Sequence, residues 1–385
     1  MKITIEQNEK TSALMKAMAS NDPNKSMEAL AAAADFVAAP INAAIDNAPT
    51  ISNLFETMSF TEGDNPSIPL ELFHDITDED YLQVYSQQIA GGLPTNQLFP
   101  AHNELKFDTY TLDSAWSFDR KYARRSRLDV LSATFQRMLQ EILLKQERNA
   151  MNVLATALVK GNSKYGSSST AAKGNHIIGS TQENRFLLHD LNKLITRSKR
   201  INASFSAGTP VGGSKSGVTD LLVSPEIIEK VREMGYNPVN TVDSDGTTAS
   251  GSDSGQLVTD EVRNQLYGAA GMPSFYGINL MEMLELGVGQ RYNSIFGAVV
   301  AAESATVAGA GGGSWATSDD EILIGIDRSR RSLIRPTVTE EDSNGAFNIM
   351  VDDSFNLRSG KMGYFGRLEE GRISLEDRGL VGLVV

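Results

Sequence analysis

The spacing of apolar residues predicts one unusually long helix near the middle of the chain. Between Arg124 and Asn162, apolar side chains recur at separations of three, four and seven, the period of a single buried stripe. Gly161 is expected to end this helix. About 33 residues at ~1.5 Å each make a rod of roughly 50 Å, longer than a small domain is wide. The stripe expected to face the core consists of Leu131, Phe135, Met138, Ile142 and Leu154.

An alternation of apolar and polar residues precedes this helix, over 104–120. Its parity changes near Asp108, where we expect a bulge, and the alternation breaks again at Asp113. This pattern predicts two strands of a long hairpin. Because few apolar residues serve both faces, we expect the hairpin to project from the main body.

Residues 1–70 have the pattern of an arm and not of a domain. Two helices are expected, over 9–20 and over 25–39, the second ending before Pro40. The rest of the segment is rich in proline, glycine and asparagine, with scattered large apolar residues. Such a segment seldom builds a core of its own, so we expect it to lie along another part of the assembly.

The second half of the chain reads as short strand and helix units. A helix is expected over 184–201, and a buried strand, Leu221–Val223, leads into another helix. Ser224 is the expected N-cap of that helix and Pro225 its first residue. Further strands are expected in "EILIGID", in "RSLIRPTVTE" and in the tail, which together indicate a mixed α/β domain.

Composition narrows the function classes. The chain has 385 residues and a net charge of −13. Because binding to phosphates needs clustered cations, this charge argues against a protein that binds nucleic acid over a wide surface. It has no cysteine, which excludes disulfides, thiolate metal sites and cysteine nucleophiles. The first residues lack a secretory pattern. The most apolar stretch is interrupted by Asp35 and Pro40, so no membrane segment is expected. We expect a soluble protein, cytosolic when made.

Motifs that could carry chemistry are weak. "GTPVGGSKS" displaces the lysine of a phosphate-binding loop by one position, lacks a preceding strand and favours a surface loop. "GVGQRY" lacks the third glycine of a dinucleotide fingerprint and favours a turn. The four histidines, which do not pair at helical spacing, are His74, His102, His176 and His189. Acidic runs such as "DITDED" and "RLEEGR" are interpreted as solvated loops. No catalytic residue, cofactor or metal site is therefore expected.

A cluster of basic residues stands just before the long helix. Cations at a helix start oppose the helix dipole unless an anion compensates. We expect salt bridges between subunits, with acidic residues such as those at 78–80 as partners. A solvated face and a small nucleic-acid patch remain alternatives. The residues of the cluster are Arg120, Lys121, Arg124, Arg125 and Arg127.

The order of these parts resembles the major capsid proteins of tailed bacteriophages, which have the Hong Kong 97-type fold. "NELKFDTYTLDSAWSFDRKY" looks like the family's extended loop, and "RLDVLSATFQRMLQEILLKQERNAMNVLATALVKG" looks like its spine helix. "LHDLNKLITRSKRI" and "TDLLVSPEIIEKVREMGYNP" look like pieces of its axial domain. "WATSDDEILIGIDRSRRSLIR" and "GRLEEGRISLEDRGLVGLVV" look like the strands that close the chain. The likeness covers nearly the whole sequence.

The resemblance implies an α+β fold with five parts. These are an N-terminal arm (1–70), a first peripheral strand with the extended β-hairpin loop (71–125), the spine helix with the peripheral domain (126–185), the axial α/β domain (186–320) and a return to the peripheral domain (321–385). The assembly residues that it suggests, in the extended loop and at its base, are Lys106, Trp116, Arg120, Lys121, Arg124, Arg125 and Arg127.

The function that the resemblance implies is self-assembly and not enzymatic catalysis. Pentamers and hexamers would form an icosahedral shell around the double-stranded DNA genome of a tailed phage. Further partners would be portal, scaffolding and decoration proteins, and the DNA would be held without sequence-specific binding. The protein would be made in the host cytoplasm and reside in the virion capsid. An encapsulin-like nanocompartment shell is the alternative, and a soluble α/β enzyme is a more remote one.

Overall fold

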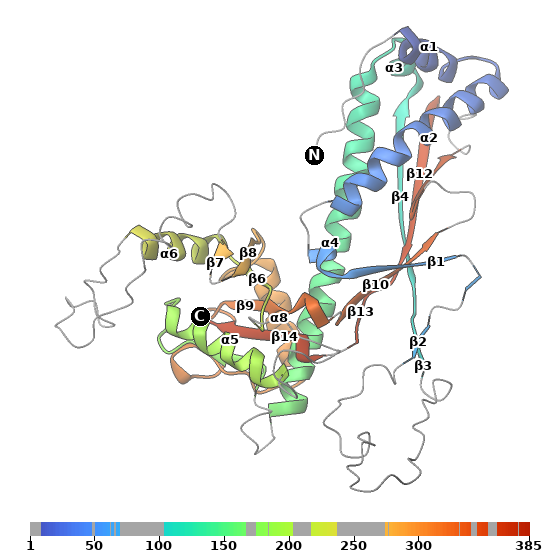
Figure 1. Ribbon diagram of the computed structural model, residues 1–385. Coiled ribbons are helices and arrows are strands. Elements are labelled where there is room, and N and C mark those ends of the chain that lie inside the picture. The colour runs from blue at the N-terminus through green and yellow to red at the C-terminus, as the bar shows by residue number, and fades with distance from the viewer. Residues whose placement is uncertain are drawn as a thin grey trace, which may run out of the picture. The chain divides into compact units, whose positions relative to one another are not determined.

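The computed structural model describes most of the chain as two compact units (Figure 1). The described residues are 9–47, 51–61, 63–64, 67–69, 104–166, 175–183, 185–202, 217–236, 274–275, 277–330, 332–339, 345–352, 360–375 and 377–385. Unit 1 comprises Met1–Phe73, Pro94–Ala150 and Ile334–Ile373, and unit 2 comprises His74–Leu93, Met151–Leu333 and Ser374–Val385.

Unit 1 is built on a six-stranded sheet in which β12 occupies the centre. The order β1-β10-β12-β11 is completed by β13, which pairs with β10, and by β4, which pairs with β12 along its whole length. The strands are β1 (Glu56–Thr61), β4 (Tyr110–Asp119), β10 (Leu333–Thr339), β11 (Phe347–Asp352), β12 (Lys361–Glu370) and β13 (Ile373–Ser374). A separate short pair joins β2 (Ser67–Pro69) to β3 (Glu104–Lys106).

The period of two in β12 places its buried residues on one face, against the first half of helix α4 (Leu128–Gly166). Met362, Tyr364 and Leu368 belong to the same buried cluster as the α4 side chains. Gly366 lies on the same face, and a Cβ at this position would overlap the Phe347 ring of β11 and come within 3.0 Å of the Met138 sulfur of α4. The glycine therefore leaves room for these two side chains.

The N-terminal helices complete the core of unit 1. They are α1 (Glu9–Met18) and α2 (Pro23–Asn47), followed by the short helix η1 (Ile51–Leu54). Met18, Leu30 and Ile41 are buried in the same cluster as α4 and β12, and α2 packs on β11. The described part of the arm thus packs on its own chain.

Helix α2 continues through Pro40, so the prediction that it ends before this residue is wrong. Proline removes the hydrogen bond to the carbonyl four residues earlier, that of Phe36. Phe36 is 63% exposed, so this side of the helix faces away from the core. Val37 and Ile41, buried on either side of the proline, hold the helix on the core. By length and composition Pro23–Ile45 could also span a membrane, but half of that window is buried inside the protein.

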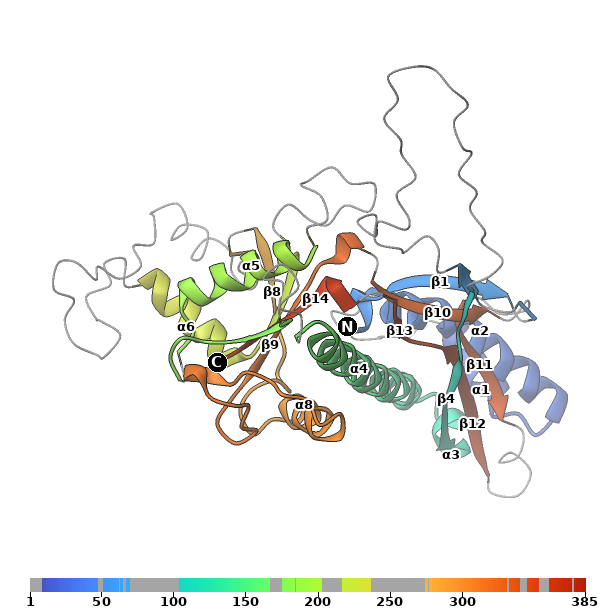
Figure 2. The ribbon, with the colours of Figure 1, turned by 90° about the horizontal axis from the view of Figure 1, so that it is seen from below.

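Unit 2 contains a mixed six-stranded sheet of order β5-β14-β9-β6-β8-β7. Its strands are β5 (Ile177–Gly179), β6 (Asp220–Val223), β7 (Ser274–Phe275), β8 (Ile278–Glu282), β9 (Ile322–Ile326) and β14 (Leu380–Val384). Its helices include α5 (Leu188–Asn202), α6 (Pro225–Tyr236) and α8 (Arg291–Ala302). Figure 2 shows α5 on one side of strands β9 and β14 and α8 on the other.

Both faces of this sheet are covered, which explains why β6, β9 and β14 are buried at every position. Helices α5 and α6 share a buried cluster with one face. On the other face, the Leu158 side chain of α4 lies beside Gly382 of β14. The predicted start of α6 is confirmed, because the Ser224 hydroxyl accepts a hydrogen bond from the Ile227 amide at 3.2 Å.

Helix α4 is continuous over 39 residues, or roughly 58 Å, and contributes to the cores of both units. The predicted stop at Gly161 is wrong, because the helix runs on to Gly166. Gly161 is buried instead where α4 meets His176 and Asp377, and a Cβ there would lie 2.9 Å from the Asp377 Cβ. Close packing, and not termination, requires this glycine.

Two predictions about strand pairing are also wrong. Residues 104–120 do not form a hairpin, because β4 runs without a break through Asp113. Its partner is β12, which is distant in the sequence: Asp119 lies opposite Lys361, 242 residues later. Strand β14 pairs with β9 and β5 in unit 2, so only Ile334–Ile373 of the predicted return over 321–385 belongs to unit 1. The α+β class itself is confirmed by the mixture of helices and sheets.

Candidate assembly surface

The basic cluster lies on a separate short helix, α3 (Arg120–Arg124), and on the turn that joins it to α4. Ser126, with φ of 52°, breaks the path between the two helices, so Arg124 does not start the long helix as predicted. Lys121 and Arg124 fall in the last turn of α3, where the helix dipole favours cations. Because Ser126 separates α3 from α4, these two cations lie at a helix end that favours positive charge and not at the start of the long helix.

Three of the five cations have a polar or acidic partner nearby in the same unit. Lys121 Nζ lies 2.9 Å from Asp119, and Arg124 Nη2 donates to the Asn21 side chain at 3.1 Å. Arg127 forms a bidentate pair with Asp129 in the first turn of α4, with bonds of 2.9 and 2.6 Å. The hydrogen bond from Arg127 lowers the pKa of the Asp129 carboxyl. These exposed pairs add little to the stability of the fold, because water screens their charges.

Arg120 and Arg125 differ from these three. Arg120 is half-buried, and its Nε is buried without a hydrogen-bond partner among the described residues. Arg125 is exposed, and its side chain has no ion-pair partner in the described part of the chain. Salt bridges between subunits remain a prediction, and Arg125 is the cation best placed to make one. The acidic residues 78–80, suggested as partners, lie outside the described residues.

Trp116 is not part of a projecting loop. It lies in β4 opposite Tyr364 of β12, and its indole Nε1 donates to the Glu141 carboxylate of α4 at 3.0 Å. The Arg137 guanidinium lies 5.1 Å from its ring centroid. Trp116 therefore joins the sheet to the helix within unit 1. Lys106 is exposed on β3, opposite Ser67 of β2, and its assembly role stays a prediction.

Four residues of the predicted helix stripe lie in the unit 1 core. Leu131, Phe135, Met138 and Ile142 are buried in the cluster that includes β12. The Phe135 and Tyr364 rings are 4.9 Å apart between centroids. Leu154 is also fully buried, but it belongs to the part of α4 that lies in unit 2.

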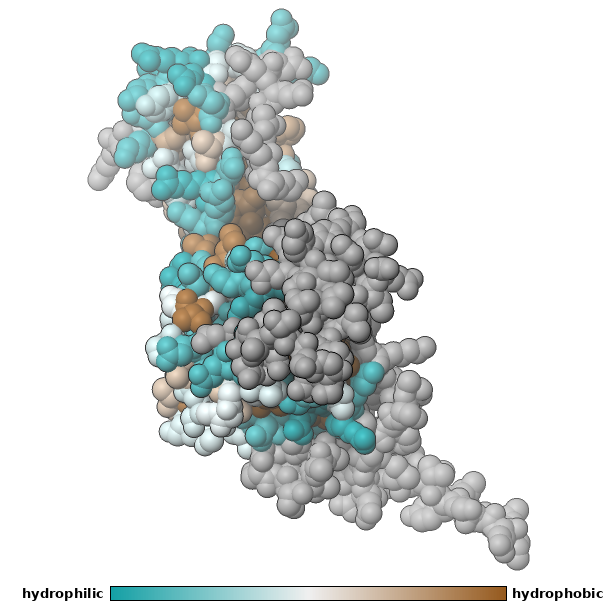
Figure 3. All heavy atoms as spheres, turned by 90° about the vertical axis from the view of Figure 1, so that its left-hand side faces the viewer, coloured by the Kyte–Doolittle hydropathy of each residue, from teal (hydrophilic) through white to brown (hydrophobic). Residues whose placement is uncertain are grey.

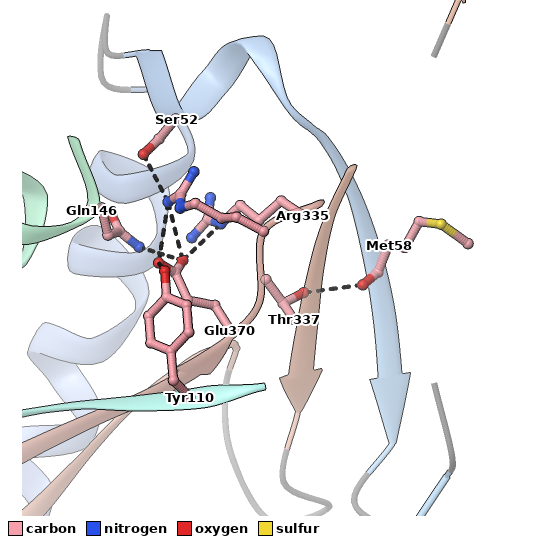
Figure 4. A network of polar contacts seen from close by, with 8 residues as sticks. Ser52, Met58, Tyr110, Gln146, Arg335, Thr337 and Glu370 are labelled. Atoms are coloured by element: carbon pink, nitrogen blue, oxygen red, sulfur yellow. Dashed lines mark hydrogen bonds and ion pairs between the residues drawn. The ribbon is translucent and has the colours of Figure 1, made fainter. Parts of the chain in front are cut away.

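A buried charge network joins the strands of unit 1 to α4, and it was missed from the sequence (Figure 4). Glu370, at the end of β12, accepts hydrogen bonds from Arg335 at 2.9 Å and from Arg372 at 3.1 Å. It also accepts from Gln146 and Tyr110, both at 2.9 Å. "RLEEGR" is therefore not simply a solvated loop. The available signal was the β12 period, which places Glu370 on the same face as Tyr364.

This network contains two arginines for one glutamate. The Arg335 and Arg372 side chains are 2% and 1% exposed, and Glu370 is fully buried. Arg372 also donates to the Ser52 hydroxyl at 2.8 Å and lies over the Phe55 ring at 5.2 Å. Burial, together with the Glu370 carboxylate, raises the pKa of Tyr110. Removing one member of such a network would leave buried charge uncompensated.

Of the four histidines, the structure describes two, His176 and His189. His176 is fully buried in unit 2, with Nδ1 2.9 Å from the Leu380 carbonyl oxygen, and burial lowers its pKa to about 4. His189 is exposed on α5, in keeping with the interpretation as a solvated residue. His74 and His102 lie outside the described residues, as does "GTPVGGSKS". No group of three His, Asp or Glu residues that could hold a metal ion occurs in the described ranges.

Comparison with known proteins gives structural matches only. No family model matches the sequence, and no curated protein matches it. The capsid of an empty GTA particle matches at 9% identity and a TM-score of 0.48, over 87% of this chain and 89% of that chain. The holo-SrpI encapsulin complex from Synechococcus elongatus matches at 10% and 0.42, over 88% and 87%. A structure of Gordonia phage Cozz matches at 14% and 0.36, over 86% and 85%.

Proposed function

We propose that this chain is a major capsid protein that self-assembles into the icosahedral shell of a tailed bacteriophage. The observation that carries the proposal is the continuity of α4 through two units that each have a separate core and sheet. Phe135 packs in the core of unit 1 and Leu158 against the sheet of unit 2, so one helix is shared by both. The resemblance to capsid proteins implies a long spine helix, which it assigns to the peripheral domain over 126–185.

The described core residues favour a structural role over an enzymatic one. The most elaborate polar site, around Glu370, is buried, and its side chains bond to one another and to Ser52. It lies where β4, β10, β12 and α4 come together. Groups placed in this way hold strands and a helix in register, and they are poorly placed to reach a substrate.

The finer parts of the proposal concern the assembly. Copies of the chain would form pentamers and hexamers, with unit 2 as the axial domain and with the extended loop, within 71–125, over a neighbour. Because the described arm packs on its own chain, its ties to other copies would use the outer face of α2, where Phe36 is exposed. Portal, scaffolding and decoration proteins would be further partners.

The packaged partner would be the double-stranded DNA genome, held without reading its sequence. A net charge of −13 suits a shell that must not trap the DNA entering it. The protein would be made in the host cytoplasm and reside in the virion capsid. An encapsulin-like shell is the second candidate, since the same arrangement of parts could enclose an enzyme instead of DNA.

Electron microscopy of the purified full-length protein tests the proposal. We expect closed particles of uniform size. A small defined oligomer with no closed particles, measured at concentrations that span assembly, would contradict a shell function and favour the soluble enzyme. Particles produced during infection should protect DNA from nuclease. Closed particles that instead hold a protein cargo and no protected DNA would favour the encapsulin-like function.

A further inference from the structure

A basic hollow lies along helix α5 at one edge of the unit 2 sheet. Its volume is about 620 Å³. Its lining comes from α5 and from the edge strand β5, and it consists of Ile178, Gly179, His189, Asn192, Lys193, Thr196, Arg197 and Arg200. The lining contains three cations and no carboxylate. We call it the basic groove.

The cations of the basic groove are only partly neutralised within unit 2. Lys193 lies 3.6 Å from the buried Asp190 carboxylate and donates to the Thr181 hydroxyl at 3.0 Å. Arg197 and Arg200 have no ion-pair partner among the described residues. In a chain whose net charge is −13, an uncompensated positive groove is a local exception. It is suited to an acidic partner whose apolar side chain can rest on Ile178 and on the aliphatic stems of the cations.

A loop of matching chemistry lies after β8, and we call residues 282–290 the Leu284 loop. Leu284 is 77% exposed, and Glu282 beside it is exposed and has no ion-pair partner among the described residues. Val288 is 46% exposed. The Glu226 carboxylate of α6 lies over this loop, beside Gly287. The loop thus exposes two apolar side chains, Leu284 and Val288, with the carboxylates of Glu282 and Glu226 nearby.

The Leu284 loop is held in shape by unit 2. Met283 and Leu286 are buried, and the Met283 amide donates to the Val223 carbonyl at 2.9 Å. The turn at Gly287 and Gly289 uses φ values of 131° and 74°, which glycine adopts at little cost. A single exposed leucine is ordinary on a protein surface. A leucine held out on an anchored loop that also carries the exposed Glu282 has the features of a contact residue.

The groove lies at the β5 edge of the sheet, and the loop follows β8, on the far side of three intervening strands. Strands β14, β9 and β6 separate β5, which lines the groove, from β8, which leads into the loop. At ~4.8 Å per strand the separation is roughly 20 Å, so the two surfaces of one copy cannot meet each other. Complementary patches at two separate places on one subunit give a head-to-tail contact, and repeating such a contact around an axis makes a ring when the rotation closes.

We propose that the Leu284 loop of one copy docks in the basic groove of the next copy. The contact rests on the proposed shell function, to which it adds the pair of surfaces that joins unit 2 of neighbouring copies. Leu284 would lie against Ile178, and Glu282 would pair with Arg200 or Arg197. A nucleic-acid backbone is the rival occupant. Figure 3 shows one face of the molecule, on which the coloured, described residues are largely hydrophilic with small separate apolar patches. Leu284, 77% exposed, is the most exposed large apolar residue in the described part of the chain. Leu284 has no role in a contact with phosphates.

The first test compares two neighbouring charge reversals on α5. Arg200 lines the groove, whereas Lys199 is exposed on the same helix but does not line it. For Arg200→Glu we expect the protein concentration that gives half-maximal assembly to rise by about tenfold or more, the scale of one lost charge contact. For Lys199→Glu we expect less than a twofold change. Equal effects from the two variants would overturn the proposal.

The second test asks for rescue, which a misfolded variant could not show. Arg200→Glu combined with Glu282→Arg restores opposite charges at every head-to-tail contact, and we expect assembly to recover most of its loss. Failure of this double variant, with circular dichroism showing that the subunit is folded, would overturn the proposed pair. Leu284→Ser should impair assembly, whereas Leu144→Ser, at an exposed leucine of unit 1, should not.

The outcomes separate this proposal from the shell function. If the wild-type protein forms closed particles and Arg200→Glu assembles equally well, the docking contact is wrong and the shell function stands. If Arg200→Glu assembles normally but its particles retain less DNA, the groove binds nucleic acid and the docking contact is wrong. If the wild-type protein forms no particle at any concentration, the shell function is wrong, and the docking contact, which rests on it, is wrong as well.

Discussion

Phe135 offers a direct test of how α4 is held on the unit 1 sheet. Its side chain is fully buried, and its ring lies 4.9 Å from that of Tyr364 between centroids. Phe135→Ala removes the ring and leaves a cavity between helix and sheet. Such changes cost about 3–5 kcal/mol. Because whole domains are stable by only about 5–15 kcal/mol, this loss should lower the urea midpoint of unit 1 strongly.

The two tryptophans allow each unit to be followed separately. Trp116 lies in unit 1 and Trp315 in unit 2, where it packs on Phe296. In a Trp315→Phe background, tryptophan fluorescence of the unassembled subunit reports on unit 1 alone. In this background, urea unfolding of Phe135→Ala should show the lower free energy of unfolding of unit 1. The slope of that free energy against urea concentration should stay unchanged.

Two matched variants complete this experiment. Gln140→Ala, at an exposed position of the same helix, should change the stability by less than about 0.5 kcal/mol. Tyr364→Phe should be neutral or stabilising by about 1 kcal/mol, because the buried Tyr364 hydroxyl has no hydrogen-bond partner among the described residues. A loss below about 1 kcal/mol for Phe135→Ala would refute the packing argument. A loss at Gln140 as large as that at Phe135 would refute it equally.

Three further predictions follow from the sites described above. Glu370→Ala should cost about 3–5 kcal/mol in urea unfolding, because it leaves Arg335 and Arg372 buried without their carboxylate, and a loss below 1 kcal/mol would contradict the network. His176 is neutral in the folded protein and has a pKa of about 4, lowered from 6.5, so its stabilising effect is complete above pH 6.5 and is lost as the pH falls toward 4. His176→Gln should therefore reduce the stability difference between pH 7 and pH 5 by about 2 kcal/mol, followed through Trp315, and an unchanged difference would contradict the shift. Arg124→Glu should leave the subunit folded, since it breaks only an exposed contact with Asn21, but should impair closure of the shell, and normal particles in electron micrographs would remove the role of Arg124 between subunits.

The local patterns in the sequence predicted the elements well where neighbours in sequence decide the structure. The apolar stripe located α4, and Ser224 followed by Pro225 located the start of α6 to the residue. The strand and helix units of the second half predicted a mixed α/β domain, whereas the α+β class was implied by the resemblance to capsid proteins. The apolar stripe and the helix cap depend on side chains within one or two turns of each other.

Glycine and proline were read as local signals and were wrong where packing overrides them. Pro40 stays inside α2 because Val37 and Ile41 are buried on the unit 1 core, which compensates for one lost hydrogen bond. Gly161 stays inside α4 because Asp377, more than two hundred residues away in the sequence, packs against it. The sequence around each residue contains no sign of these distant partners.

The sequence by itself determined which segments form helices and strands, because hydrophobic period and capping residues act over a few positions. Only the tertiary structure decided that β4 pairs with β12, that β14 joins unit 2, and that Glu370 lies buried between two arginines. It alone placed the basic groove at the β5 edge of one sheet and the Leu284 loop after β8, with β14, β9 and β6 between them. Strand pairing joins segments far apart in the chain through backbone hydrogen bonds that any residue except proline can make, so the choice of partner depends on the packing of the whole unit.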